Sequence, residues 1–280
     1  MKRPPFVAGM FYDFDKSDLL KRLEWCFSDN KVGPGVLPER TKRRLEKNVG
    51  AIVPHAGYIY SGPVAAWAFF ELSKLGVPDT VILIGPNHTG SGAEIGVWPG
   101  GIWQTPLGEL KVAKDVVETL LESSVNLMPD TASHIGEHSL EVQLPFLQYI
   151  YGNDFEIVPI TMMIQNPEFS EVLSESIKKV FERFPDRKFV VIASSDLNHY
   201  EPQEITVEKD EKFIKAVISG DPKKVFRVVR EENITACGFG PVTVLLKLKL
   251  GSPKLLKHAT SGDVSGDFAH VVGYASFIVS

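Results

Sequence analysis

The feature that most restricts the fold of this chain is a set of apolar runs separated by stretches with helical spacing. Each run is continuous rather than alternating, which is typical of strands buried on both faces of a sheet. Runs and helical stretches follow one another, and this order predicts an α/β fold with a mostly parallel sheet covered by helices on both faces. The runs are "NVGAIVPHAG" (48–57), "TVILIGPNH" (80–88), "FEIVPITM" (155–162) and "KFVVIASSD" (188–196).

The rest of the chain supplies further elements of the same kind. Its last two segments are strand-like, and we expect them to be antiparallel additions to the sheet. No repeat and no linker is visible, so we expect a single domain over residues 1–280. Helices are expected over residues 62–76, 113–124, 137–152, 167–184, 206–218, 221–231 and 240–249, and the final strands over 253–262 and 270–280.

Composition narrows the class of protein. The chain has 280 residues, 44% hydrophobic and 23% charged, which is ordinary for a globular protein. Its net charge of −5 provides no basic surplus to neutralise phosphates, so neither a nucleic acid nor a membrane surface is expected as a partner. The two cysteines make no disulfide framework, which favours a cytoplasmic location.

Polar side chains follow three of the apolar runs directly. They are His55, His88 and the pair Asp196 and His199 in "SSDLNHY". In open α/β sheets, ligands bind beyond the carboxyl ends of the strands, so we expect these side chains at one edge of the sheet. Imidazole is a common metal ligand and a general acid or base near neutral pH. One histidine at a strand end is more often structural, but three together favour a binding or catalytic site.

The two cysteines differ in context. Cys26 belongs to an amphipathic helical stretch and is expected to be structural. Cys237 lies in "TACGFGPVT", before a Gly/Pro turn and a helix. A cysteine near a helix start can have a lowered pKa and be a reactive thiolate, whereas many free cysteines are buried and inert. The residues alone leave both interpretations of Cys237 open.

A further candidate is the segment "IGEHSLEVQLPF". On a helix, His138 and Glu141 share a face, and such a pair can bind metal or relay protons. The alternative is an ordinary helix start, at which Glu137 and neighbouring polar side chains stabilise the N-terminus. We interpret His258 and His270, which lie in the terminal strands, as structural or surface residues.

Taken in order along the chain, several motifs resemble those of the MEMO family. They are "PPFVAGMFY", "VPHAGYIYSG", "IGPNHTG", "GEHSLEVQLPFL", "SSDLNHY" and "TACGFGPV", and they extend from about residue 4 to residue 278. The resemblance implies a three-layer α/β/α sandwich similar to the class III extradiol dioxygenases of the LigB type. It also implies a pocket with His55, His88 and Cys237 as metal ligands.

The resemblance also places His199 in this pocket with Asp196 and His138 nearby, and the residue patterns suggest further roles. His199 lines the pocket as the acid or base of catalysis, and Asp196 is expected to orient an imidazole. His138 and Glu141 are candidate ligand-binding residues. Tyr58 is a candidate for an aromatic wall, although core packing accounts for it equally well.

One departure bears on activity, because the dioxygenases have a glutamate where this chain has Cys237. Two histidines and a carboxylate suit Fe(II) and oxygen chemistry, whereas a thiolate favours copper, iron or zinc and is itself oxidisable. A mononuclear Fe or Cu protein with redox chemistry is therefore expected. The alternatives are a zinc-type hydrolase and a non-catalytic binding or scaffold protein that captures a small molecule or peptide. The oligomeric state stays open.

Overall fold

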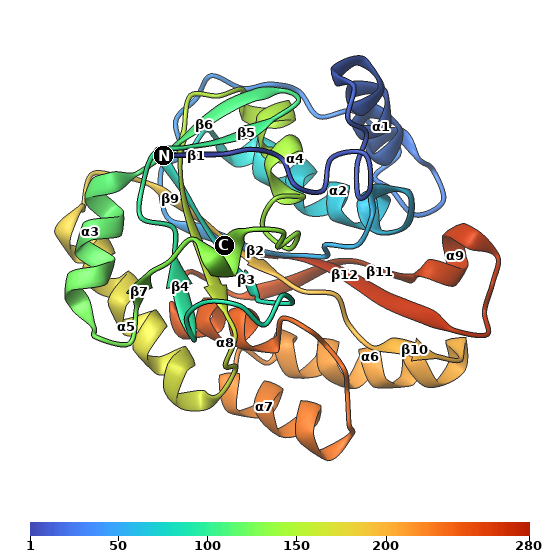
Figure 1. Ribbon diagram of the computed structural model, residues 1–280. Helices are drawn as coiled ribbons and strands as arrows, with labels where there is room; N and C mark the ends of the chain where they lie inside the picture. Colours follow the sequence, from blue (N-terminus) through green and yellow to red (C-terminus); the bar gives the residue numbers. More distant parts are fainter.

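A computed structural model, which describes residues 1–280, has a twelve-stranded mixed sheet between two layers of helices (Figure 1). The strand order is β1-β5-β6-β8-β3-β9-β2-β12-β10, with β11 beside β12, and β4 beside β7 and β8. The predicted α/β sandwich is confirmed. The strands are β1 (Lys2–Arg3), β2 (Val49–Val53), β3 (Thr80–Pro86), β4 (Ile95–Val97), β5 (Ile102–Thr105), β6 (Gly108–Val112), β7 (Met128–Pro129), β8 (Glu156–Met162), β9 (Phe189–Ser194), β10 (His199–Glu201), β11 (Pro253–Thr260) and β12 (Val271–Val279).

The centre of the sheet explains the continuous apolar runs. β8, β3, β9 and β2 are neighbours and pair in parallel. Every residue of β2, β3 and β9 is buried, because helices cover both faces of these strands. Since the strands are parallel and adjacent, their carboxyl ends lie side by side at one edge.

The helices divide between the two faces. α1, α2 and α4 pack together on one face, and α3, α5, α6, α7 and α8 pack on the other (Figure 1). None of the helices combines the length and the apolar character needed to cross a lipid bilayer. The helices are α1 (Lys16–Ser28), α2 (Tyr58–Leu75), α3 (Lys114–Ser123), α4 (Gln143–Tyr151), α5 (Pro167–Arg183), α6 (Gln203–Ile218), α7 (Pro222–Glu231), α8 (Phe239–Lys247) and α9 (Ser261–Ser265), with a short 3₁₀ turn at Ala132–His134.

Both ends of the chain are built into the sheet. The C-terminal strand β12 pairs antiparallel with β2 and β11, as expected. The N-terminal arm was not expected to contribute a strand, yet β1 pairs in parallel with β5. It carries Arg3 into the interior, where Arg3 contacts the segment before α4.

The predicted helix over residues 137–152 is wrong in its first part. The helix α4 begins only at Gln143, and residues 139–142 form turns. Pro145 provides the physical reason, since its ring would clash with the carbonyl group of Glu141 if the helix extended backwards. Pro145 therefore lies in the first turn of α4, where a missing N–H costs little. His138 and Glu141 consequently do not share a helical face.

Candidate functional site

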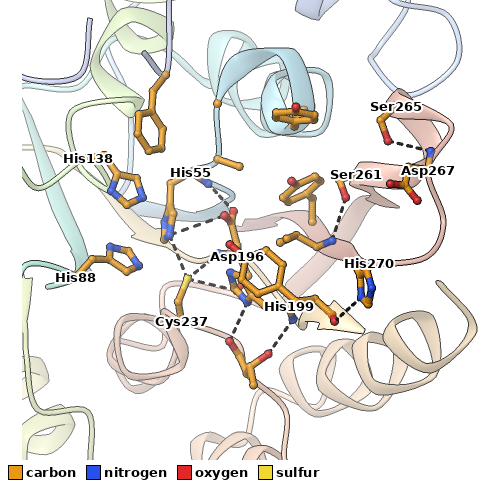
Figure 2. Close-up of a pocket in the computed structure, with 18 residues that line it drawn as sticks. His55, His88, His138, Asp196, His199, Cys237, Ser261, Ser265, Asp267 and His270 are labelled. Atoms are coloured by element: carbon orange, nitrogen blue, oxygen red, sulfur yellow. Dashed lines mark hydrogen bonds and ion pairs between the residues drawn. The ribbon is translucent and has the colours of Figure 1, made fainter. Parts of the chain in front are cut away.

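Polar side chains meet where three neighbouring strands end. His55 follows β2, His88 follows β3 and Asp196 follows β9, each just beyond the last strand residue. Because these strands are adjacent and parallel, the three positions lie at the same edge of the sheet. Cys237 approaches them from the loop before α8. Figure 2 shows the four side chains together in one cavity.

Three of these side chains bring potential metal ligands together. Ligand atoms of His55, His88 and Cys237 all lie within 4.8 Å of one another. Sγ of Cys237 is 3.1 Å from Nε2 of His55. The rings of His55 and His88 are nearly perpendicular, with centroids 5.2 Å apart. One ion could contact all three atoms after small shifts of the side chains.

The second nitrogen of each imidazole already has a partner. Nδ1 of His88 lies 2.9 Å from a carboxylate oxygen of Glu137, and the other oxygen accepts from the His88 backbone N–H. Nδ1 of His55 lies 2.8 Å from the hydroxyl oxygen of Ser194. Such partners are usual for metal-binding histidines, because they fix the ring and leave Nε2 free for the metal.

Glu137 holds an imidazole ring in place and is not itself counted among the three candidate metal ligands. A second group of potential ligand atoms comprises His88, Glu137 and His138. The Glu137 carboxylate, however, is buried and is occupied by His88 and by the backbone N–H of Ser139. Burial opposes its ionisation, but the bonds and charge of His88 outweigh burial and lower the pKa of Glu137 to about 2. The carboxylate is thus ionised and suited to hold His88.

The protonation states suit metal binding. Burial lowers the pKa of His55 well below its usual range, and the neighbouring histidines add to this effect, so the imidazole is neutral. Burial raises the pKa of the Cys237 thiol, and the charge of Asp196 raises it further. A bound cation would reverse this shift by stabilising the thiolate. Two imidazoles and one thiolate are a donor set that fits Cu, Zn or Fe.

Asp196 and His199 lie beside this group. The Asp196 carboxylate accepts a hydrogen bond from the backbone N–H of His55 at 2.7 Å. Burial raises the pKa of Asp196 to about 7, although the His55 N–H opposes this. Nδ1 of His199 lies 3.0 Å from the carbonyl oxygen of Thr235, to which it can only donate, so Nε2 is unprotonated when the ring is neutral. Burial lowers the pKa of His199.

His138 forms another part of the pocket wall. Its ring stacks on His88 with centroids 4.5 Å apart and on Phe11 with centroids 4.4 Å apart. Burial lowers the pKa of His138 to about 4. Phe11 belongs to the N-terminal arm, so the arm contributes directly to the site.

Two candidate ligand-binding residues, Glu141 and Tyr58, do not line the pocket. The Glu141 carboxylate is buried beneath the N-terminal arm, where it pairs with Arg3 and accepts from the Tyr12 hydroxyl. Tyr58 is buried in the core and donates to the carbonyl oxygen of Val142 at 2.6 Å. His138 lines the pocket, whereas Glu141 contacts the N-terminal arm, so their spacing of three does not place both in the site.

The outer part of the pocket was missed by the sequence reasoning. The cavity has a volume of about 760 Å³. His270, which was interpreted as structural or surface, lines this cavity (Figure 2). β12 runs antiparallel to β2, so the start of β12 rather than its end reaches the edge where the other strands finish. The expected antiparallel placement of the last strand was the sequence signal that could have located this part of the pocket. The other outer residues are Ser261, Ser265, Asp267, Val272 and Tyr274.

The two cysteines are expected to differ in reactivity. Cys26 is fully buried, and its Sγ lies so close to Gly62 of α2 that a Cβ there would be only 2.5 Å away. Cys237 lines the open pocket. Treatment of the native metal-free protein with iodoacetamide, followed by peptide mass spectrometry, should therefore modify Cys237 first. Cys237→Ser should abolish this native-state labelling, and faster modification of Cys26 would contradict the assignment.

Comparisons with known proteins agree with these observations. The family model described as "Memo-like protein" matches residues 3–278. A "MEMO1 family protein" of Thermotoga neapolitana is 49% identical over 280 residues and covers 100% of both chains. One of Sulfurisphaera tokodaii is 50% identical, over 99% of this chain and 98% of the relative. The crystal structure of an uncharacterized protein from Escherichia coli K12 superposes with a TM-score of 0.57 at 12% identity, covering 84% of this chain and 100% of that chain, and supports the fold alone.

Proposed function

The chain belongs to the family of Memo-like proteins, and on this premise we propose that it binds one transition-metal ion through His55, His88 and Cys237. One observation carries the proposal: three ligand atoms lie within 4.8 Å of one another, while the other nitrogen of each imidazole is held by a buried partner. Such an arrangement is costly to build for packing alone, because it buries several polar groups at once.

The donor set suits copper, iron or zinc, of which we propose copper or iron. Thiolate and imidazole ligands bind Cu(I), Zn and Fe well, whereas Mg, Ca and Mn prefer oxygen ligands. When bound, a copper or iron ion would supply redox chemistry. The resemblance to extradiol dioxygenases supports oxygen chemistry in general. The thiolate of Cys237 in place of a carboxylate argues against efficient ring cleavage, because this ligand changes the electron density at the metal and is itself open to oxidation.

His199 and Asp196 complete the proposed chemistry. The free Nε2 of a neutral His199 can accept a proton from a ligand in the pocket and return it later. Asp196 holds the backbone of His55, and its carboxyl group, with a pKa of about 7, can exist in either protonation state near neutral pH. We assign His199 the role of acid or base and Asp196 the role of an orienting group.

The pocket supports a small molecule as the ligand. Its volume is in the range of ordinary ligand sites, and aromatic rings of Phe11, Tyr60 and Tyr200 line it. Tyr200 is 73% exposed and Tyr60 is 42% exposed, and exposed aromatic side chains are also typical of protein contacts. This favours capture of a peptide, without turnover, as the second candidate function. Measured turnover of a pocket ligand would exclude purely non-catalytic binding.

The proposal is tested by loading the metal-free protein. Under anaerobic conditions, equilibrium dialysis against Cu(I), Fe(II) and Zn(II) followed by elemental analysis should give one ion per chain for copper or iron. A protein that takes up none of these ions stoichiometrically would contradict the proposal. A clear preference for Zn(II) would instead favour the hydrolase alternative, in which His199 acts as the general base on a water molecule.

A further inference from the structure

The side chains behind His55 form a buried network of hydrogen bonds. Nδ1 of His55 is 2.8 Å from the hydroxyl oxygen of Ser194. That hydroxyl donates its proton to the carbonyl oxygen of Ser139, 2.7 Å away, and accepts a bond from the side-chain amide of Gln143 at 3.0 Å. All four residues are buried, so water does not compete for these groups.

The donor and the acceptor in these hydrogen bonds can be assigned, because the carbonyl oxygens among them can only accept. The amide nitrogen of Gln143 lies 3.1 Å from the carbonyl oxygen of Pro54, which can only accept, so this end of the amide is the NH₂ group. The single proton of Ser194 is used on Ser139, and its oxygen therefore presents a lone pair to His55. With the Ser194 proton on Ser139, Nδ1 of His55 donates to Ser194, and Nε2 is the unprotonated nitrogen.

The contact at Nε2 of the His55 ring is consistent with a proton on Nδ1. Nε2 of His55 lies 3.1 Å from Sγ of Cys237, a distance at which a thiol can donate to it. Ser194 differs from Glu137, the partner of His88, because a neutral hydroxyl cannot take the proton away from Nδ1. The hydrogen-bond geometry on both sides of the ring therefore supports a proton on Nδ1 of His55.

We infer that Ser194 is a positioning residue that, together with Gln143, fixes the Nδ1–H tautomer of His55 and presents Nε2 to the metal. This inference rests on the proposed function, in which His55 is a ligand. Ser194 acts on the metal only through His55, since its hydroxyl is turned away from the cavity and does not line it.

The tautomer can be read directly in the metal-free protein. Long-range ¹H–¹⁵N correlation spectra of histidine-labelled wild type should show the His55 proton on Nδ1 only. Ser194→Ala should make the Nε2–H form detectable and should weaken metal binding about 10- to 100-fold, the usual effect of losing a partner of a metal-bound histidine. Dialysis against the metal found in the loading experiment gives the second readout.

Two further variants separate positioning from simple loss of stability. Ser194→Thr keeps the hydroxyl group and should retain both the tautomer and the affinity. Ser276→Ala removes another buried hydroxyl, which donates to Val64 in the core, and should change neither. A wild-type His55 protonated on Nε2, or a Ser194→Ala variant with unchanged tautomer and affinity, would overturn the inference. Because the tautomer is measured without metal, failure of wild type to bind any ion would overturn the proposed function separately.

Discussion

Cys237→Ser, His55→Ala and His88→Ala are each expected to purify without bound metal, while His199→Ala retains it. Loss of an outer partner alone costs about 10- to 100-fold in affinity, so loss of a direct ligand should exceed about 100-fold. His199 is expected to retain metal because its ring is held by Thr235 and its nitrogens are not part of the three-atom group. Elemental analysis and competition with a chelator of known affinity measure the effect.

His199→Ala is the matched control for these variants, since it removes an imidazole from the same cavity. It should keep the metal content of wild type and lose any turnover. Equal loss of metal in His199→Ala would mean that His199 is a fourth ligand. Full metal content in Cys237→Ser would show that the thiolate is not required.

Arg3→Met should destabilise the protein by about 3–5 kcal/mol, because it leaves a buried carboxylate without its charged partner. Arg3 is 1% exposed and Glu141 is 0% exposed, and an Nη1 of Arg3 lies 2.5 Å from the carboxylate. The same guanidinium also donates to the carbonyl oxygens of His134 and Glu137. Urea unfolding of the metal-free protein, followed by circular dichroism, measures the free energy.

Lys2→Met is the control for this prediction. Lys2 forms a surface pair with Glu109 at 2.9 Å, in which both side chains are about half exposed. Exposed pairs contribute only about 0–1 kcal/mol, so this neighbouring variant should unfold almost like wild type. If Arg3→Met and Lys2→Met lost similar amounts, the buried pair would not hold the N-terminal arm.

The inner half of the site could be predicted from the sequence because its residues are tied to local patterns. His55, His88 and Asp196 each follow a continuous apolar run, and such runs predict neighbouring parallel strands. The fold class follows from the same alternation of strands and helices. No knowledge of distant contacts is needed for these inferences.

Other parts of the site depend on contacts that local patterns do not encode. Residues 137–142 look helical in spacing, but Pro145 and the bonds from Arg3 keep them out of the helix. The burial of Arg3 depends on Glu141, a residue far along the chain. His270 reaches the pocket because β12 runs antiparallel to β2; this direction was expected, but its consequence for His270 depends on the pairing of β12 with β2.

Residues that pair in the structure are far apart in the sequence, and this separation affects the order in which their contacts can form during synthesis. Arg3 precedes Glu141 by 138 positions, so Arg3 must wait for its partner until Glu141 has emerged. His55 and Cys237 are separated by 182 positions, so a nascent chain carries two of the three proposed ligands long before it carries the third. Contacts of such length form late, after much of the chain has become available to fold. The three proposed ligands can therefore form a complete set only after Cys237 has been synthesised.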